Sequence, residues 1–140
     1  MAFNGKILEL KTNGSWVEFP AKYIKSESYK VTPDQRMESD ANRSADGYLK
    51  RTTVPHTATK IDFTTTNLTN TDVRTISNMF SAAFIDSLQR KVEIRYYHPE
   101  TDNYDTGIFY VPDIDYEINR IDVSKKVVHY NPIRYALIEY

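Results

Sequence analysis

The chain has 140 residues, a length that fits one domain, and it carries 18 basic against 19 acidic side chains. The resulting net charge of -1 excludes the basic surface expected of a protein that binds nucleic acid or an anionic membrane. The absence of cysteine excludes disulfides, thiolate metal sites and a cysteine nucleophile.

The N-terminus lacks the basic start and apolar core of a signal peptide. No apolar run approaches the roughly 20 residues that a membrane helix needs. We therefore expect a soluble protein made in the cytoplasm. The eleven tyrosines favour β-sheets and protein interfaces, because a tyrosine packs its ring on a pleated surface and keeps a polar tip.

The first 31 residues predict three strands. Residues 6–10 and 15–19 are short apolar-polar segments joined by Asn13-Gly14, the strongest short signal for a β-hairpin. Residues 21–31 then alternate in a way that is typical of a strand with one solvated face.

Residues 32–47 form a long polar segment in which Met37 is the one sizeable apolar side chain. A loop of this length is unusual inside a compact domain. We expect either a loop that is disordered in the free protein or an arm that orders on contact with a neighbour. The candidate subunit-interface residues are its mixed charges, Arg36, Glu38, Asp40, Arg43 and Asp46. The plain alternative is a solvated, mobile loop.

Residues 48–66 return to β character, with a bend, bulge or edge position expected at Pro55. A helix follows over about residues 70–84. Thr69 is its expected N-cap, and Asp72 lies in the first turn, where the helix dipole favours a carboxylate. Apolar residues recur at helical spacing, so the helix should cover a sheet with one face.

Four more β segments are predicted at residues 92–97, 104–111, 114–119 and 127–140, with residues 98–103 as a turn and an interruption at Pro132. The order of sheet, one helix and sheet predicts an α+β fold. We expect a single domain over residues 1–140, built as a mostly antiparallel β-sandwich or barrel-like sheets with one flanking α-helix.

The histidines carry no metal-binding pattern. His56, His98 and His129 have no second histidine at a helical spacing, so they are interpreted as surface or turn residues. Residues 102–113 superficially match a calcium loop, but two ligand positions and the bidentate glutamate are missing, which favours a hairpin turn.

Three carboxylates, Asp113, Asp115 and Glu117, alternate along one predicted strand. They indicate either the solvated face of a sheet or a site for a hard cation. Motifs for a serine nucleophile and a glycine-rich phosphate loop are missing from the sequence. We therefore predict no catalytic residues, no metal and no cofactor.

Four motifs occur in a fixed order between residues 24 and 140. They are RSADGYLKR at 43–51, YHPET at 97–101, TGIFY at 106–110 and YALIE at 135–139. In this order the chain resembles a group of small bacteriophage or prophage proteins encoded among tail genes. The resemblance implies a tail-tube-like fold, in which two packed antiparallel sheets flanked by one helix form rings around a lumen.

In such proteins a long loop between early strands reaches an adjacent subunit, and residues 32–47 occupy that place. The resemblance implies a non-enzymatic virion structural protein that self-assembles in a tail tube, distal tail or baseplate hub. Its partners would be copies of itself in a ring and neighbouring tail proteins, with no membrane and no sequence-specific nucleic acid, although DNA passes through such a lumen. It would reside in the host cytoplasm during assembly and then in the virion tail.

Two alternatives remain open at this point. One is a monomeric β-rich binding module or tail-assembly factor. The other is a metal-dependent enzyme that uses Asp113, Asp115 and Glu117.

Overall fold

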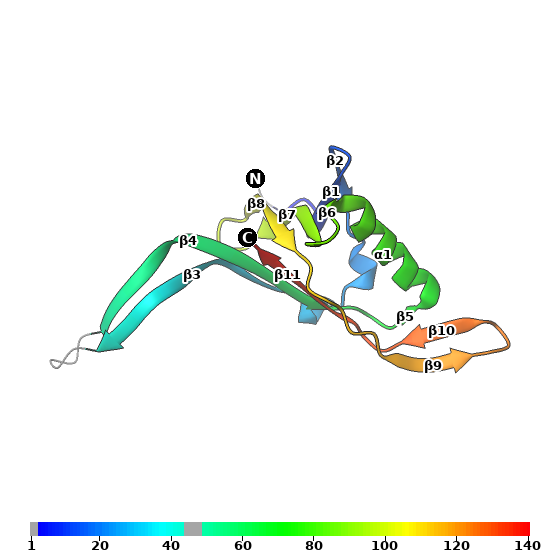
Figure 1. The fold of residues 1–140 in the computed structure, drawn as a ribbon. Helices are drawn as coiled ribbons and strands as arrows, with labels where there is room; N and C mark the ends of the chain where they lie inside the picture. Colours follow the sequence, from blue (N-terminus) through cyan, green and yellow to red (C-terminus); the bar gives the residue numbers. More distant parts are fainter. Residues whose placement is uncertain (1–2, 44–48) are drawn as a thin grey trace.

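The computed structural model describes residues 3–43 and 49–140, with side chains described for residues 3–35 and 57–140. An antiparallel sheet and one helix form the body, and two β-hairpins project from opposite sides of it (Figure 1). The strands are β1 (Leu8–Thr12), β2 (Ser15–Glu18), β3 (Lys30–Arg43), β4 (Leu49–Thr64), β5 (Leu68–Thr69), β6 (Phe84–Asp86), β7 (Lys91–His98), β8 (Asn103–Tyr110), β9 (Ile118–Asp122), β10 (Val127–Tyr130) and β11 (Arg134–Glu139). The helices are α1 (Asn70–Ala83) and two 3-10 turns, η1 (Ala21–Tyr23) and η2 (Ser26–Ser28).

The strands form two sheets. The main sheet has the order β2-β1-β7-β8-β11-β4-β3, with β6 paired to β7, and the small sheet has the order β5-β10-β9. Within the described chain, every strand pair is antiparallel. The predicted α+β class is thereby confirmed. The main sheet does not close into a barrel, because its end strands β2 and β3 are not paired with each other.

The predicted N-terminal hairpin is confirmed. Asn13 and Gly14 have φ angles of 50° and 81°, so both central residues of the turn adopt left-handed backbone. This turn matches the right-handed twist of the flanking strands, which explains why Asn-Gly specifies it.

The strand predicted over residues 21–31 is wrong for most of its length. The chain instead makes η1 and η2, and β3 begins only at Lys30. Tyr23 and Ile24 are both buried. In this turn both neighbouring side chains join the hydrophobic core.

The long polar loop predicted over residues 32–47 is wrong for residues 32–43, which belong to β3 and pair with β4. Residues 44–47 lie outside the described residues. The two strands continue beyond the main sheet as a long hairpin (Figure 1). A hairpin that leaves the body needs no buried face, so polar residues can form it through the backbone ladder alone.

The interruption predicted at Pro55 is confirmed as a bulge. Arg36 pairs with Thr57 and Met37 with Val54, so Pro55 and His56 are extra residues on β4. Proline has no backbone N–H to donate to the ladder, and a bulge removes the need for that bond.

The predicted helix is confirmed with its cap. The Thr69 hydroxyl accepts from the Asp72 backbone N–H, and the Asp72 carboxylate accepts from the Thr69 backbone N–H, which makes a capping box. Its buried residues Ile76, Phe80 and Ala83 lie in the core that the main sheet lines.

Aromatic rings fill the centre of this core. The Phe63 ring on β4 lies 5.5 Å from both Phe19 and Tyr135 and 5.8 Å from Tyr29, measured between ring centroids. Phe80 on α1 stacks on Tyr135 at 5.8 Å. Ile61 and Phe63 lie two residues apart on β4, and both are fully buried.

The C-terminal quarter differs from the prediction in one place. Residues 111–117 are not a strand, and β9 begins at Ile118 rather than at residue 114. The interruption at Pro132 is confirmed, because it separates β10 from β11. The β9–β10 hairpin projects from the side of the body opposite to the β3–β4 hairpin (Figure 1).

Candidate functional site

The candidate interface residues lie on the outer part of the β3–β4 hairpin. Four of the five belong to β3, and Asp46 lies outside the described residues. Their partners on β4, by register, are Thr57 for Arg36, Thr53 for Glu38, Thr52 for Asp40 and Leu49 for Arg43. The structure therefore brings these four residues together on one projecting element.

A buried polar cluster lies where this hairpin leaves the body. His98, at the end of β7, is 3% exposed, and its Nε2 lies 3.0 Å from Oδ2 of Asp34 on β3. Asp34 has a φ of 49°, in the left-handed region, and lies in the bulge between Thr32 and Gln35. This bulge re-aims the Asp34 side chain toward the body, which is a common use of an extra residue in a strand.

Thr59 on β4 is the centre of the cluster. Its hydroxyl accepts from the Asp34 backbone N–H at 3.1 Å and shares a hydrogen bond of 3.1 Å with the Tyr96 hydroxyl. Its backbone N–H donates to Glu139 Oε1 at 2.8 Å. Gly107 leaves room for that carboxylate, because a Cβ at this position would overlap Glu139.

The electrostatics of the cluster keep its phenol neutral. Burial is the largest cause that raises the pKa of Tyr96 to about 12; the carboxylates of Asp105, Glu139 and Asp34 contribute to this rise, while the Thr59 hydrogen bond acts in the opposite direction. A neutral hydroxyl can both donate and accept, so Tyr96 stays a hydrogen-bonding partner over the physiological range of pH.

The cluster joins strands that are not neighbours. Tyr96 on β7 reaches Thr59 on β4 across β8 and β11, although three strand spacings in a flat sheet amount to about 14 Å. The main sheet is therefore strongly curled at this end. The base of the β3–β4 hairpin is tied to β7 and β11, which sets the direction in which the hairpin projects.

The interpretation of His98 as a surface residue is wrong, and its own strand carried the signal. Val92, Ile94 and Tyr96 are buried on alternate positions of β7, and His98 is the next position on that face. If the alternation of buried residues along β7 is continued beyond Tyr96, His98 is the next buried position. The expected turn after it is confirmed, with Asp102 in left-handed backbone at a φ of 49°.

The other candidate residues are dispersed. Nε2 of His129 lies 3.1 Å from the Arg120 guanidinium on the exposed β9–β10 hairpin. Asp113, Asp115 and Glu117 are exposed on an irregular segment, and Glu117 accepts a hydrogen bond from a neighbouring asparagine. No group of three or more His, Asp and Glu side chains that could hold a metal ion occurs in residues 3–35 and 57–140.

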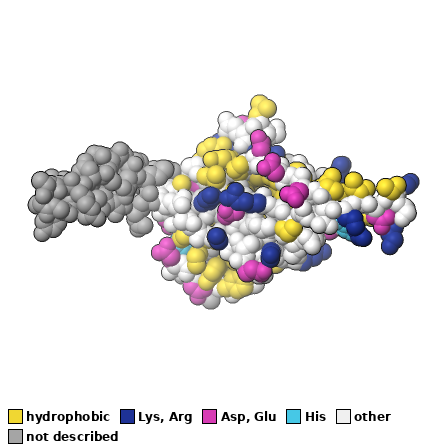
Figure 2. All heavy atoms as spheres, turned by 90° about the horizontal axis from the view of Figure 1, so that it is seen from below, with side chains coloured by type: hydrophobic (Ala, Val, Ile, Leu, Met, Phe, Trp, Pro, Cys, Tyr) yellow, Lys and Arg dark blue, Asp and Glu magenta, His cyan; other side chains and the backbone are white. Residues whose placement is uncertain are grey.

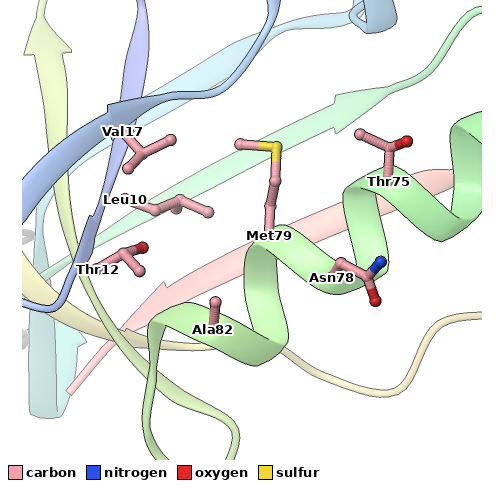
Figure 3. Close-up of a pocket in the computed structure, with 7 residues that line it drawn as sticks. All are labelled: Leu10, Thr12, Val17, Thr75, Asn78, Met79 and Ala82. Carbon is pink, nitrogen blue, oxygen red and sulfur yellow. The ribbon is translucent and has the colours of Figure 1, made fainter.

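An open groove of about 400 Å³ lies between the β1–β2 hairpin and α1. Met79 points from the helix toward Leu10 and Val17 (Figure 3). The residues that line the groove are Leu10, Thr12, Val17, Thr75, Asn78, Met79 and Ala82. None of these seven side chains is ionisable, so the groove suits apolar contact rather than acid–base chemistry.

Comparison with known proteins assigns a family. A model of a family of unknown function, DUF6711, matches residues 1–140. The chain belongs to the DUF6711 family. No curated protein and no solved structure matches it. Among the described residues of this DUF6711 chain, no helix has both the length and the apolar character needed to cross a membrane.

Proposed function

We propose that this DUF6711 protein is a non-enzymatic structural subunit that associates with copies of itself, in a ring, within a bacteriophage tail. Its position there would be the tail tube, the distal tail or the baseplate hub. It would assemble in the host cytoplasm and remain in the virion. The proposal joins the order of motifs in the sequence to one structural observation, the β3–β4 hairpin that extends beyond the body.

The hairpin supports the proposal by its composition and its attachment. Its outer part carries two basic and two acidic residues of β3. A surface with both signs of charge favours one defined alignment with a neighbouring subunit over unspecific attraction. Its base is fixed by the cluster around Thr59. A fixed direction lowers the entropy lost when the hairpin meets a partner.

The test is the mass of the protein in solution. In a shortened variant, residues 38–53 are replaced by an Asn-Gly turn between Met37 and Val54, which are paired in the native register. The full chain should associate with rising concentration in light scattering, and the shortened variant should stay monomeric. Near-ultraviolet circular dichroism of Trp16, which lies in the body, checks that the variant is folded.

A second variant separates charge from length. Arg36→Ser, Glu38→Ser, Asp40→Ser and Arg43→Ser together keep the hairpin and leave the net charge unchanged. Loss of association would assign the contact to these side chains, whereas retention would assign it to the backbone or to other residues of the hairpin. A full chain that is monomeric at every concentration would overturn the proposal and favour a monomeric binding module.

A further inference from the structure

We propose that the β9–β10 hairpin of one copy docks on the acidic, aromatic end of the next copy, formed by the β7–β8 turn and the N-terminal segment, in a head-to-tail contact. This inference rests on the proposed self-association and names the two surfaces that meet. Each surface exposes large apolar or aromatic side chains, and the two surfaces are complementary in charge.

The β9–β10 hairpin exposes an unusual share of the apolar surface. Nine large apolar side chains are exposed in the described part of the chain, and four of them lie within residues 116–123. They are Tyr116, Ile118, Ile121 and Val123. Isolated exposed apolar residues are normal, but a cluster on one projecting element marks an interaction surface.

A bulge places Ile118 and Ile121 on one face of the hairpin. Tyr130 pairs with Ile118 and Val128 with Ile121, so Asn119 is an extra residue on β9. Partners across antiparallel strands share a face, and residues two apart on β10 share it too. Without the bulge, Ile118 and Ile121 would point in opposite directions.

The same hairpin is basic. Residues 116–130, which hold the exposed apolar side chains, contain Arg120, Lys125 and Lys126 against Glu117 and Asp122, a net charge of +1. The dark-blue lysine and arginine side chains lie around the tip of the hairpin, beside its yellow apolar side chains (Figure 2). A partner should therefore offer acidic groups around an apolar centre.

The opposite end of the body has this character. Residues 97–111 contain Glu100, Asp102 and Asp105, all exposed, and neither lysine nor arginine; together with the exposed Lys6 of residues 3–6, the net charge of this end is -2. Phe3 and Tyr97 meet edge to face at 5.3 Å between ring centroids, and Phe3 is 49% exposed. The acidic end is thus an aromatic cluster with carboxylates around it.

The positions of the two surfaces allow a chain of copies. The β7–β8 turn lies at the start of β8, and β9 follows the far end of β8, so one molecule presents the surfaces on opposite sides (Figure 1). A contact between unlike surfaces repeats from copy to copy and forms a ring when the rotation closes. The β3–β4 hairpin leaves the body beside the acidic end, through the Asp34–His98 contact, so both hairpins would serve the same contact.

Charge reversal of the full-length protein tests the contact by light scattering. Lys125→Glu with Lys126→Glu should weaken association at least tenfold, and so should Glu100→Lys with Asp105→Lys. In a mixture of the two variants, both contacts between unlike chains join opposite charges, so the mixture should regain the association that each variant alone has lost. Combining all four changes in one chain should restore association. The control, Lys22→Glu with Lys25→Glu, reverses two exposed charges elsewhere and should leave association unchanged.

Cysteine crosslinking gives a second readout. The native chain has no cysteine, so Val123→Cys with Thr101→Cys should yield only disulfides that join different copies. Association of the wild type that neither reversal weakens, or an absence of the crosslink in assembled protein, would overturn this inference and leave the proposed function standing. A wild type that never associates would overturn both.

Discussion

The two projecting hairpins have the same secondary structure but different attachments. The β3–β4 hairpin continues two strands of the main sheet, and its base lies over the fully buried Phe63 and the cluster around Thr59. The β9–β10 hairpin is held by the two-residue strand β5 and by exposed bonds, such as the Val128 N–H to the Asn70 side chain at 3.1 Å. Full burial fixes the first hairpin, whereas exposed hydrogen bonds and the half-buried Tyr130 hold the second. Mutations at the two bases should therefore differ widely in their effect on stability.

The largest effect is expected at the base of the first hairpin. Phe63→Ala removes a fully buried ring that contacts Phe19, Tyr29 and Tyr135. The free energy of unfolding should fall by about 3–5 kcal/mol, because the substitution leaves a cavity between rings that cannot close up. Urea denaturation followed by circular dichroism measures it. A loss below about 1 kcal/mol would contradict the packing described.

A smaller loss is expected from the polar cluster. Thr59→Val keeps the shape of the side chain but leaves the buried Tyr96 hydroxyl without its partner. We expect a loss of about 1–3 kcal/mol in the free energy of unfolding. The double variant Thr59→Val with Tyr96→Phe removes both partners and should recover much of that loss in the same denaturation experiment. Equal stability of the single and double variants would argue against the hydrogen bond.

Alkaline pH should weaken the main sheet. Burial raises the pKa of Tyr29 and Tyr135 above the usual range and that of Tyr96 to about 12. These phenols ionise near pH 10 in the unfolded chain but stay neutral in the folded one. Their contribution to stability is complete below pH 10 and is lost as the pH rises toward 12. Absorbance at the phenolate band should show these tyrosines titrating together with unfolding. If all eleven tyrosines titrated near pH 10 while the protein stayed folded, the expected link between their ionisation and unfolding would be contradicted.

The smallest effect on stability is expected at the second hairpin. Ile121 is 61% exposed, so Ile121→Ser should change the free energy of unfolding by no more than about 0.5 kcal/mol. Association of the full chain should nevertheless weaken, because the side chain lies on the docking face. Thermal melts and light scattering on the same sample separate the two effects. A large drop in the melting temperature would show that Ile121 supports the fold itself.

Local sequence signals predicted the elements whose causes are local. The Asn13-Gly14 turn, the capping box of Thr69 and Asp72 and the bulge at Pro55 each follow from the backbone preferences of one or two residues. The alternation along β7 likewise reports burial directly, and extending it by one residue would have placed His98 inside.

The errors occurred where a distant segment decides the outcome. Residues 32–43 look like a loop because they are polar, yet the ladder with β4 makes them a strand. Residues 21–28 look like a strand, yet they form η1 and η2, and Tyr23 and Ile24 are buried in the core. A short window of sequence shows neither the β4 strand that pairs with residues 32–43 nor the core that surrounds Tyr23 and Ile24. The same reason hid the cluster around Thr59, whose members come from β3, β4, β7 and β11.

The sequence by itself therefore determined the antiparallel α+β class, the single capped helix and the tyrosine-rich sheet, because these depend on periodicity and on local backbone preference. The tertiary structure decided that the polar segment is a hairpin, that a bulge places Ile118 and Ile121 on one face of the β9–β10 hairpin, and that the acidic and basic ends lie on opposite sides of the body. Those features depend on which strands pair and in which register, and pairing is a property of segments that are far apart in the chain.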